Sequence, residues 1–94
     1  MDLNFEWDDE KAKKNLRNHQ VNFEEAKSVF KDPFLITYPD PKHSIGEQRY
    51  LNIRLSARGQ VLIVVHTERG ENIRIISCRK ATTSERRDYE EGNF

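Results

Sequence analysis

The sequence lacks several features that define common protein classes. It has one cysteine among 94 residues, which excludes an internal disulfide and a four-cysteine zinc site. Its four glycines stand apart from one another, so no glycine-rich phosphate loop is present. No G-x-S-x-G motif marks a serine hydrolase. The longest uncharged apolar run is Val61–Val65, far short of the roughly 20 residues that a membrane span needs.

Targeting and metal-binding signals are equally scarce. The first residues carry neither the basic nor the apolar stretch of a signal peptide, so we expect a cytoplasmic protein with no membrane partner. The histidines, His19, His43 and His66, are too widely spaced for a zinc motif. We therefore expect no metal and no other cofactor.

Charge is divided unevenly along the chain, although its total is zero. Residues 1–41 contain 6 basic and 9 acidic side chains, residues 42–87 contain 10 basic and 4 acidic ones, and residues 88–94 add three acidic ones. A basic segment between acidic ones can attract a polyanion with one face and a basic partner with another. The alternative is that these are ordinary solvated side chains.

Helix signals dominate the first third of the chain. Asp8 is placed to cap a helix over residues 9 to about 18. Asn22 and Glu25 form the pattern of a capping box at the start of a second helix, over residues 23–31. This pattern predicts that the Asn22 side chain caps the helix and that the Glu25 side chain reaches back.

Strand signals dominate the remainder, where the apolar period changes from 3.6 to 2. The expected strands cover residues 3–7, 34–38, 48–56, 60–68 and 73–79. A second capping box, Thr82 with Glu85, starts a terminal helix. The order predicts one α+β domain over residues 1–94, with a mostly antiparallel sheet of four to five strands, two N-terminal helices packed on it and a C-terminal helix. Nine aromatic residues favour a folded domain even though 34% of the residues are charged.

A polar cluster is expected where two neighbouring strands end. Period two places His66 and Glu68 on one face of the strand over residues 60–68. The turn after it is expected to bring Glu68 and Arg69 close to Arg74 in register. Such groups are sufficient to cleave RNA without a metal. One group removes the proton of the 2′-hydroxyl, another protonates the leaving 5′-oxygen, and guanidinium groups hold the phosphate.

The residue pattern thus makes His66, Glu68 and Arg74 candidate catalytic residues, with the acid and base roles of His66 and Glu68 open. The alternative is a cross-strand ion pair between Glu68 and Arg74 with no catalytic role.

Further RNA contacts are predicted beyond this cluster, from Arg69, Arg79, Lys80, Arg86 and Tyr89. The alternative for the basic residues is a solvated surface with ion pairs between successive helical turns. Tyr89 either anchors the last helix or stacks on a base.

Several stretches resemble one known family in order and spacing. They are Phe5-Glu6-Trp7-Asp8, His19-Gln20-Val21-Asn22-Phe23-Glu24-Glu25-Ala26, Phe30-Lys31-Asp32-Pro33, Gly46-Glu47-Gln48-Arg49, Val64-Val65-His66-Thr67-Glu68-Arg69 and Arg74-Ile75-Ile76-Ser77-Cys78-Arg79-Lys80-Ala81. The sequence is thereby similar to the BrnT family, and this resemblance covers nearly the whole chain.

The resemblance implies a RelE-like fold and a ribonuclease toxin of a type II toxin–antitoxin pair, which stops translation by cutting RNA. It implies a BrnA-like antitoxin of ribbon-helix-helix type as partner in a hetero-oligomer, with operator DNA bound only through that antitoxin. It also implies that His66, Glu68, Arg69, Arg74 and Arg79 lie in or near the RNA-cleaving site.

Two positions depart from the family pattern. Arg54 stands where the family often has glycine, and Cys78 stands where it usually has alanine. We expect Arg54 to add a charge near the sheet surface and Cys78 to be conservative.

The sequence therefore favours a metal-independent endoribonuclease toxin. The alternative is a binding module without catalysis, such as a degenerate toxin that acts as co-repressor with its antitoxin.

Overall fold

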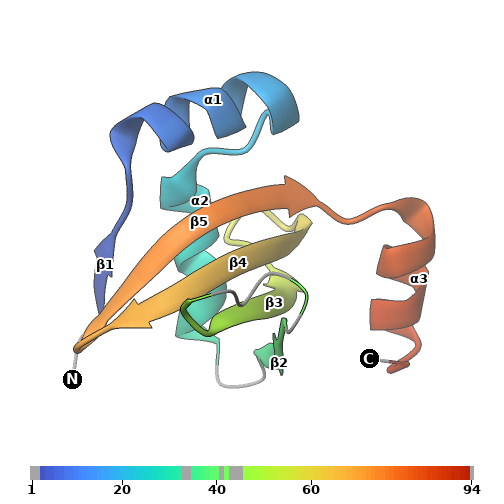
Figure 1. Ribbon diagram of the computed structural model, residues 1–94. Coiled ribbons are helices and arrows are strands. Elements are labelled where there is room, and N and C mark those ends of the chain that lie inside the picture. Colours follow the sequence, from blue (N-terminus) through green and yellow to red (C-terminus); the bar gives the residue numbers. More distant parts are fainter. Residues whose placement is uncertain (1–2, 33–34, 41, 43–45, 94) are drawn as a thin grey trace.

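The computed structural model describes residues 3–32, 35–40, 42 and 46–93. The elements are β1 (Asn4–Glu6), α1 (Asp9–His19), α2 (Phe23–Lys27), the 3₁₀ helix η1 (Ser28–Lys31), β2 (Ile36–Pro39), β3 (Arg49–Leu55), β4 (Val61–Arg69), β5 (Asn72–Lys80) and α3 (Thr83–Glu90) (Figure 1). The predicted α+β class is confirmed. Of the strand predicted over residues 34–38, Phe34 lies outside the described residues.

The five strands form one mixed sheet in the order β1-β5-β4-β3-β2. β1 pairs with β5 in parallel, and the other neighbouring strands are antiparallel. The β4–β5 ladder contains one irregularity, because Val65 pairs with Ser77 whereas His66 pairs with Ile75. Ile76 is therefore an extra residue on β5, a bulge that increases the local twist.

Side-chain caps begin the helices as the sequence predicts. The Asp8 carboxylate accepts a hydrogen bond from the Lys11 N–H at 3.1 Å. The Asn22 side chain likewise accepts one from the Glu25 N–H at 2.7 Å. The capping box of Thr82 with Glu85 at the start of α3 is confirmed in both directions.

The reciprocal bond predicted for Glu25 is wrong. Its side chain does not reach back to Asn22; it accepts hydrogen bonds from Ser56 Oγ at 2.6 Å and Gln60 Nε2 at 2.9 Å. Glu25 is buried, because this side of the short helix packs on the β3–β4 hairpin. A buried carboxylate needs donors from the interior, and the hairpin supplies them.

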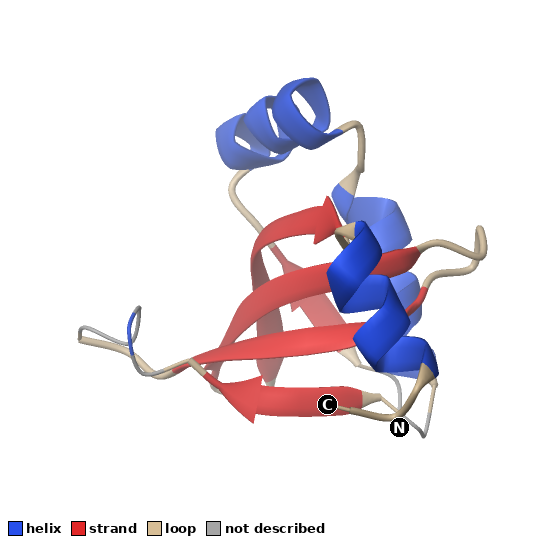
Figure 2. Cartoon of the chain, turned by 90° about the vertical axis from the view of Figure 1, so that its right-hand side faces the viewer, coloured by secondary structure: helices blue, strands red, loops and turns tan. Residues whose placement is uncertain are grey.

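The main core lies between the sheet and the first two helices. Its buried residues are Val21, Phe23, Ala26, Val29, Leu62, Val64, Ile75 and Cys78. We call this side of the sheet the α2 face. The opposite side, the α3 face, has a smaller core of Ile53, Val61 and Ile63, against which Ala81 and Tyr89 pack. In Figure 2, α3 lies on the near side of the strands and α2 lies behind them.

Helix α1 closes an edge of the sheet that β1 leaves open. β1 pairs only with residues 72–74 of β5, so in the described part of the chain no strand continues along that side of β5, opposite β4. Asn15 of α1 takes the place of a strand there. It donates to the Cys78 carbonyl at 2.8 Å and accepts from the Cys78 N–H at 3.1 Å. Both backbone groups of Cys78 are thus satisfied although they are buried.

Candidate functional site

His66 is a buried residue of the α2 face. Only 4% of it is exposed, and its ring stacks on Tyr50 and meets the edge of Phe30 at centroid distances of 5.1 and 5.2 Å. Asn52 fixes the ring: its Oδ1 accepts a hydrogen bond from Thr37, while its Nδ2 donates to the Val64 carbonyl and lies 2.7 Å from His66 Nδ1. This arrangement makes Nδ1 the acceptor, so the proton of the neutral ring is on Nε2.

Glu68 lies beside the protonated nitrogen of His66, as the period of two predicts. The distance from His66 Nε2 to Glu68 Oε1 is 3.9 Å, and 63% of the Glu68 side chain is exposed. Burial lowers the pKa of His66, and the charge of Glu68 offsets only part of this effect. His66 is therefore neutral at pH 7, and Glu68 is the member of the pair that solvent and ligands can reach.

Arg74 lies on the other face of the sheet. A two-residue turn, Gly70-Glu71, places Arg74 opposite Thr67, and Glu68 opposite Ile73. Gly70 adopts a φ of +59°, which glycine accommodates without strain. Because neighbouring residues of a strand point to opposite faces, Arg74 is separated from Glu68 by the sheet.

The expectation that Glu68 and Arg74 are in register is therefore wrong. So is the alternative of an ion pair between them, because the ion pair that Arg74 makes is with Glu6 of β1, at 3.8 Å.

The α3 face contains a hollow beside the part of the sheet that α3 covers. Its volume is about 270 Å³, and it is lined by Asp40, Arg49, Leu51, Ile63, Val65, Ile76, Ser77 and Arg79. Arg49 pairs with Thr67 in the β3–β4 ladder, and Thr67 pairs in turn with Arg74. Arg49, Arg74 and Arg79 thus lie on the same face of the sheet. We call the cavity, which Arg49 and Arg79 line, the arginine hollow.

The capping box of α3 also holds Arg79. The guanidinium group donates to both carboxylate oxygens of Glu85, at 2.7 and 2.9 Å. The same Glu85 accepts the N–H of Thr82 at 2.8 Å. The bond from Arg79 is the main reason that the pKa of Glu85 falls to about 2. Arg79 is thus fixed at the rim of the hollow, in the bidentate geometry that guanidinium and carboxylate groups favour.

The other predicted RNA contacts lie apart from the hollow. Arg69 and Lys80 are exposed at the ends of their strands. Arg86 is exposed on α3, and its Nε lies 4.0 Å from Glu90. Tyr89 packs on the α3-face core, and its hydroxyl accepts a hydrogen bond from Arg54 at 2.6 Å. In this structure Tyr89 therefore anchors the helix.

Arg54 forms contacts with other side chains of the same protein. Besides Tyr89, its guanidinium group contacts Asp32, with Nε at 2.8 Å and Nη2 at 2.7 Å from the carboxylate. The charge of Arg54 is thus compensated, and the side chain ties α3 to the segment after η1.

The residue-based prediction missed Arg49 and Asp40 as members of the hollow. A signal for Arg49 was available, because it is in phase with Leu51 and Ile53 along β3. Asp40 follows β2, and its N–H donates to the Arg49 carbonyl at 2.8 Å. Its place in the hollow depends on the β2–β3 pairing, which the sequence does not display.

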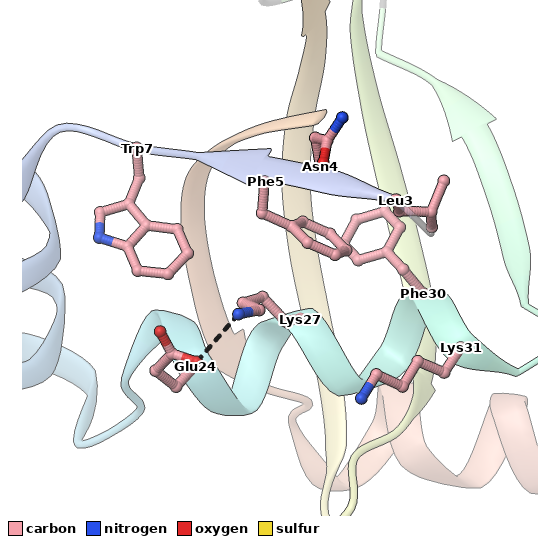
Figure 3. Close-up of a pocket in the computed structure, with 8 residues that line it drawn as sticks. All are labelled: Leu3, Asn4, Phe5, Trp7, Glu24, Lys27, Phe30 and Lys31. Atoms are coloured by element: carbon pink, nitrogen blue, oxygen red, sulfur yellow. Dashed lines mark ion pairs between the residues drawn. The ribbon is translucent and has the colours of Figure 1, made fainter. Parts of the chain in front are cut away.

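A second, larger hollow lies between β1 and the α2–η1 segment (Figure 3). It measures about 840 Å³ and contains none of the predicted site residues. Lys27 Nζ lies 5.7 and 5.9 Å from the ring centroids of Phe5 and Trp7, and it pairs with Glu24 at 3.1 Å. The lysine thus lies over both rings.

Two further findings are limited to the described ranges. Within them, no group of three or more histidine, cysteine or acidic side chains is arranged to hold a metal ion. None of the helices in the same ranges combines the length and apolar character that crossing a membrane requires.

A small α+β domain with arginines grouped on one sheet face is suited to binding phosphate groups. The family model described as "Ribonuclease toxin, BrnT, of type II toxin-antitoxin system" matches residues 7–85. The chain therefore belongs to the BrnT family of ribonuclease toxins, as its sequence motifs predicted.

Its fold is similar to the crystal structure of the Brucella abortus ribonuclease toxin BrnT, with a TM-score of 0.69 and 18% sequence identity, over 87% of this chain and 100% of that chain. No curated protein matches the sequence.

Proposed function

We propose that this protein is an active, metal-independent endoribonuclease that inhibits translation, with a RelE-like division of its sheet into a helix-covered face and an RNA-binding face. The observation that carries the proposal is the grouping of Arg49, Arg74 and Arg79 on the α3 face. Guanidinium groups stabilise the charge that builds on a phosphate when a 2′-hydroxyl attacks it. We assign this role to Arg74 and Arg79, with Arg69, Lys80 and Arg86 as outer RNA contacts.

Glu68 is the proposed general base of the predicted catalytic set. Its carboxylate is accessible, whereas Nδ1 of His66 is engaged by Asn52 and Nε2 carries the proton. His66 would then act by orienting Glu68, and the leaving 5′-oxygen would take its proton from water. An RNA strand that crosses the turn end of the β4–β5 hairpin can meet both Glu68 and Arg74, since Glu68 follows Thr67, the residue opposite Arg74.

Asp40 is the competing base, because it is the carboxylate that lines the arginine hollow. Its position beside Arg49 and Arg79 places an acceptor and phosphate ligands on one face. Glu68→Gln and Asp40→Asn therefore distinguish a reaction at the hairpin end from one inside the hollow.

A non-catalytic RNA- or protein-binding module is the second candidate. The observation that favours it is that the sheet separates the His66–Glu68 pair from Arg74. A degenerate toxin of this kind would bind its antitoxin and operator without cutting RNA.

The test is cleavage of total RNA by the purified chain in EDTA, followed by analysis of the product ends. We expect 2′,3′-cyclic or 3′-phosphate ends and loss of cleavage in Arg74→Ala. Arg58→Ala, in the turn at the opposite end of β4, is the matched control. Intact RNA, both alone and with translating ribosomes, would establish the binding module instead.

The proposed partner is a BrnA-like ribbon-helix-helix antitoxin, which forms a hetero-oligomer with the chain and carries operator binding. Membership of a type II toxin family supports an antitoxin partner. Co-purification with the product of an adjacent reading frame tests the pairing. A gel-shift assay with operator DNA, with and without the toxin chain, tests whether DNA is bound through the antitoxin.

A further inference from the structure

A small basic hollow lies beside α1, away from the predicted catalytic residues. It measures about 160 Å³ and is lined by Lys11, Lys14, Asn15, Asn18, His19 and Ile76. None of these lining residues is acidic. The hollow thus differs from that of Figure 3, where Lys27 is paired with Glu24 and lies over two aromatic rings.

Lys11 and Lys14 are not paired with a neighbouring acidic side chain in the described part of the chain. They are three residues apart, so they project from one face of the helix. Across the ranges that the structure describes, neither makes an ion pair within 4.0 Å. Lys13, which lies between them in sequence, points elsewhere and pairs with Glu10 at 3.7 Å. The two lysines are therefore available to an anionic ligand at no cost in internal contacts.

The basic hollow and the arginine hollow meet at one residue. Ile76, the extra residue of the β5 bulge, lines both of them. β1 ends its pairing at Arg74, so none of the described strands lies between the two hollows along this edge of β5. A chain of phosphates that leaves the arginine hollow over Ile76 therefore arrives at the lysines of α1.

We propose that the Lys11–Lys14 face of α1 binds backbone phosphates of the same single-stranded RNA whose reacting phosphate lies at the arginine hollow. This inference rests on the proposed RNA-cleaving function and extends its substrate site. Lysine ammonium groups act as point charges on phosphates and do not read sequence. The contacts would therefore strengthen binding to RNA that spans both hollows, whatever its bases.

The test measures binding separately from cleavage. RNA with 2′-O-methyl groups has no free 2′-hydroxyl to attack the phosphate, so its affinity can be measured by fluorescence anisotropy over a range of salt concentrations. The variant is Lys11→Gln combined with Lys14→Gln, and the matched control is Lys13→Gln. Glutamine is nearly as good a helix former as lysine, so α1 is kept, and circular dichroism verifies this.

We expect the double variant to bind more weakly and with a shallower salt dependence. Each phosphate contact on a single strand contributes about 0.7 to the slope of log K against log salt, so loss of two contacts reduces the slope by about 1.4. The control should keep the slope of the unaltered chain.

An unchanged slope and affinity in the double variant would overturn the inference, as would an equal loss in Lys13→Gln. These outcomes are independent of cleavage. If the chain does not cut unmodified RNA but the slope changes as expected, the inference is supported as an RNA-binding surface and the proposed reaction fails. If the chain cuts RNA but the slope is unchanged, the inference alone fails.

Discussion

The α2 face and the α3 face of the sheet are built differently. On the α2 face eight buried residues form one core with the helices, and the buried polar groups Asn15 and Asn52 bond to backbone and side chains around them. On the α3 face the core of the described residues is smaller, with three buried apolar side chains, and a short helix covers one end of the sheet. The rest of that face holds the arginine hollow.

The difference indicates that one face of the sheet mainly stabilises the fold and that the other is available for binding. The α2 face has little accessible surface at its centre, and even its histidine is held neutral and fixed by Asn52. On the α3 face the side chains of Arg49, Arg74 and Arg79 stay partly exposed, and Glu85 at the start of α3 holds Arg79 in place. Substitutions on the two faces should therefore have different consequences.

The largest effect is expected from Phe23→Ala on the α2 face. Phe23 is 2% exposed, and its ring meets Trp7 at a centroid distance of 5.8 Å. Its truncation leaves a cavity in the main core and should lower the free energy of unfolding by about 3–5 kcal/mol. Urea denaturation followed by circular dichroism measures the loss. Leu16→Ala, at a residue that is 48% exposed, is the control and should change stability little. A loss below about 1 kcal/mol for Phe23→Ala would contradict the assignment of the main core.

Arg79→Ala should have the next largest effect, on activity. Loss of one preorganised donor to a developing charge typically lowers a rate about 100-fold. We expect a decrease of that order in RNA cleavage, with the chain still folded, because the substitution is at the rim of the hollow and not in a core. Arg87→Ala, on an exposed position of α3, is the matched control. Equal cleavage rates for the two variants would show that the arginine hollow takes no part in the reaction.

Much of this fold follows from local signals. The caps Asp8, Asn22 and Thr82 are visible because each places an oxygen three residues before a free backbone N–H. The change of apolar period from 3.6 to 2 separates helices from strands. Local signals do not show the parallel pairing of β1 with β5 or the donors that reach Glu25, because both depend on contacts between distant segments.

The candidate site was less predictable than the fold. Period two correctly places His66 beside Glu68, since that relation lies within one strand. Placing Arg74 required the length of the turn and the ladder register, and an error of one residue moves a side chain to the other face. The sequence also does not reveal that Asn52 engages His66, because the two residues belong to different strands.

The pH dependence of stability should reveal the contact that supports Arg79. The pKa of Glu85 falls from its usual 4.5 to about 2 in the folded protein, mainly through Arg79. The unfolded chain therefore binds more protons in this window, and the stabilisation, present above pH 4.5, is lost as the pH falls toward 2. Because both side chains are partly exposed, we expect a loss of only about 1 kcal/mol. Urea midpoints at pH 6 and pH 3 should therefore differ more for the unaltered chain than for Glu85→Gln. Equal differences for the two proteins would show that the Arg79–Glu85 ion pair does not stabilise the fold in solution. Titration of His66 affects both proteins equally, because both contain it.

The smallest effect is expected from Cys78→Ala. The side chain is 1% exposed, and its Sγ lies 3.3 Å from Asn15 Nδ2, but Asn15 retains both backbone bonds to residue 78 when the sulfur is removed. We therefore expect a loss of about 0.5–1 kcal/mol, as for removal of a small buried group. Burial also raises the pKa of the thiol to about 12, so a thiol reagent at pH 8 should label it only after denaturation. Rapid labelling of the native chain would show that the α2 face opens at the edge of β5. The α2 face would then not be closed to solvent at the place where α1 covers that edge instead of a strand.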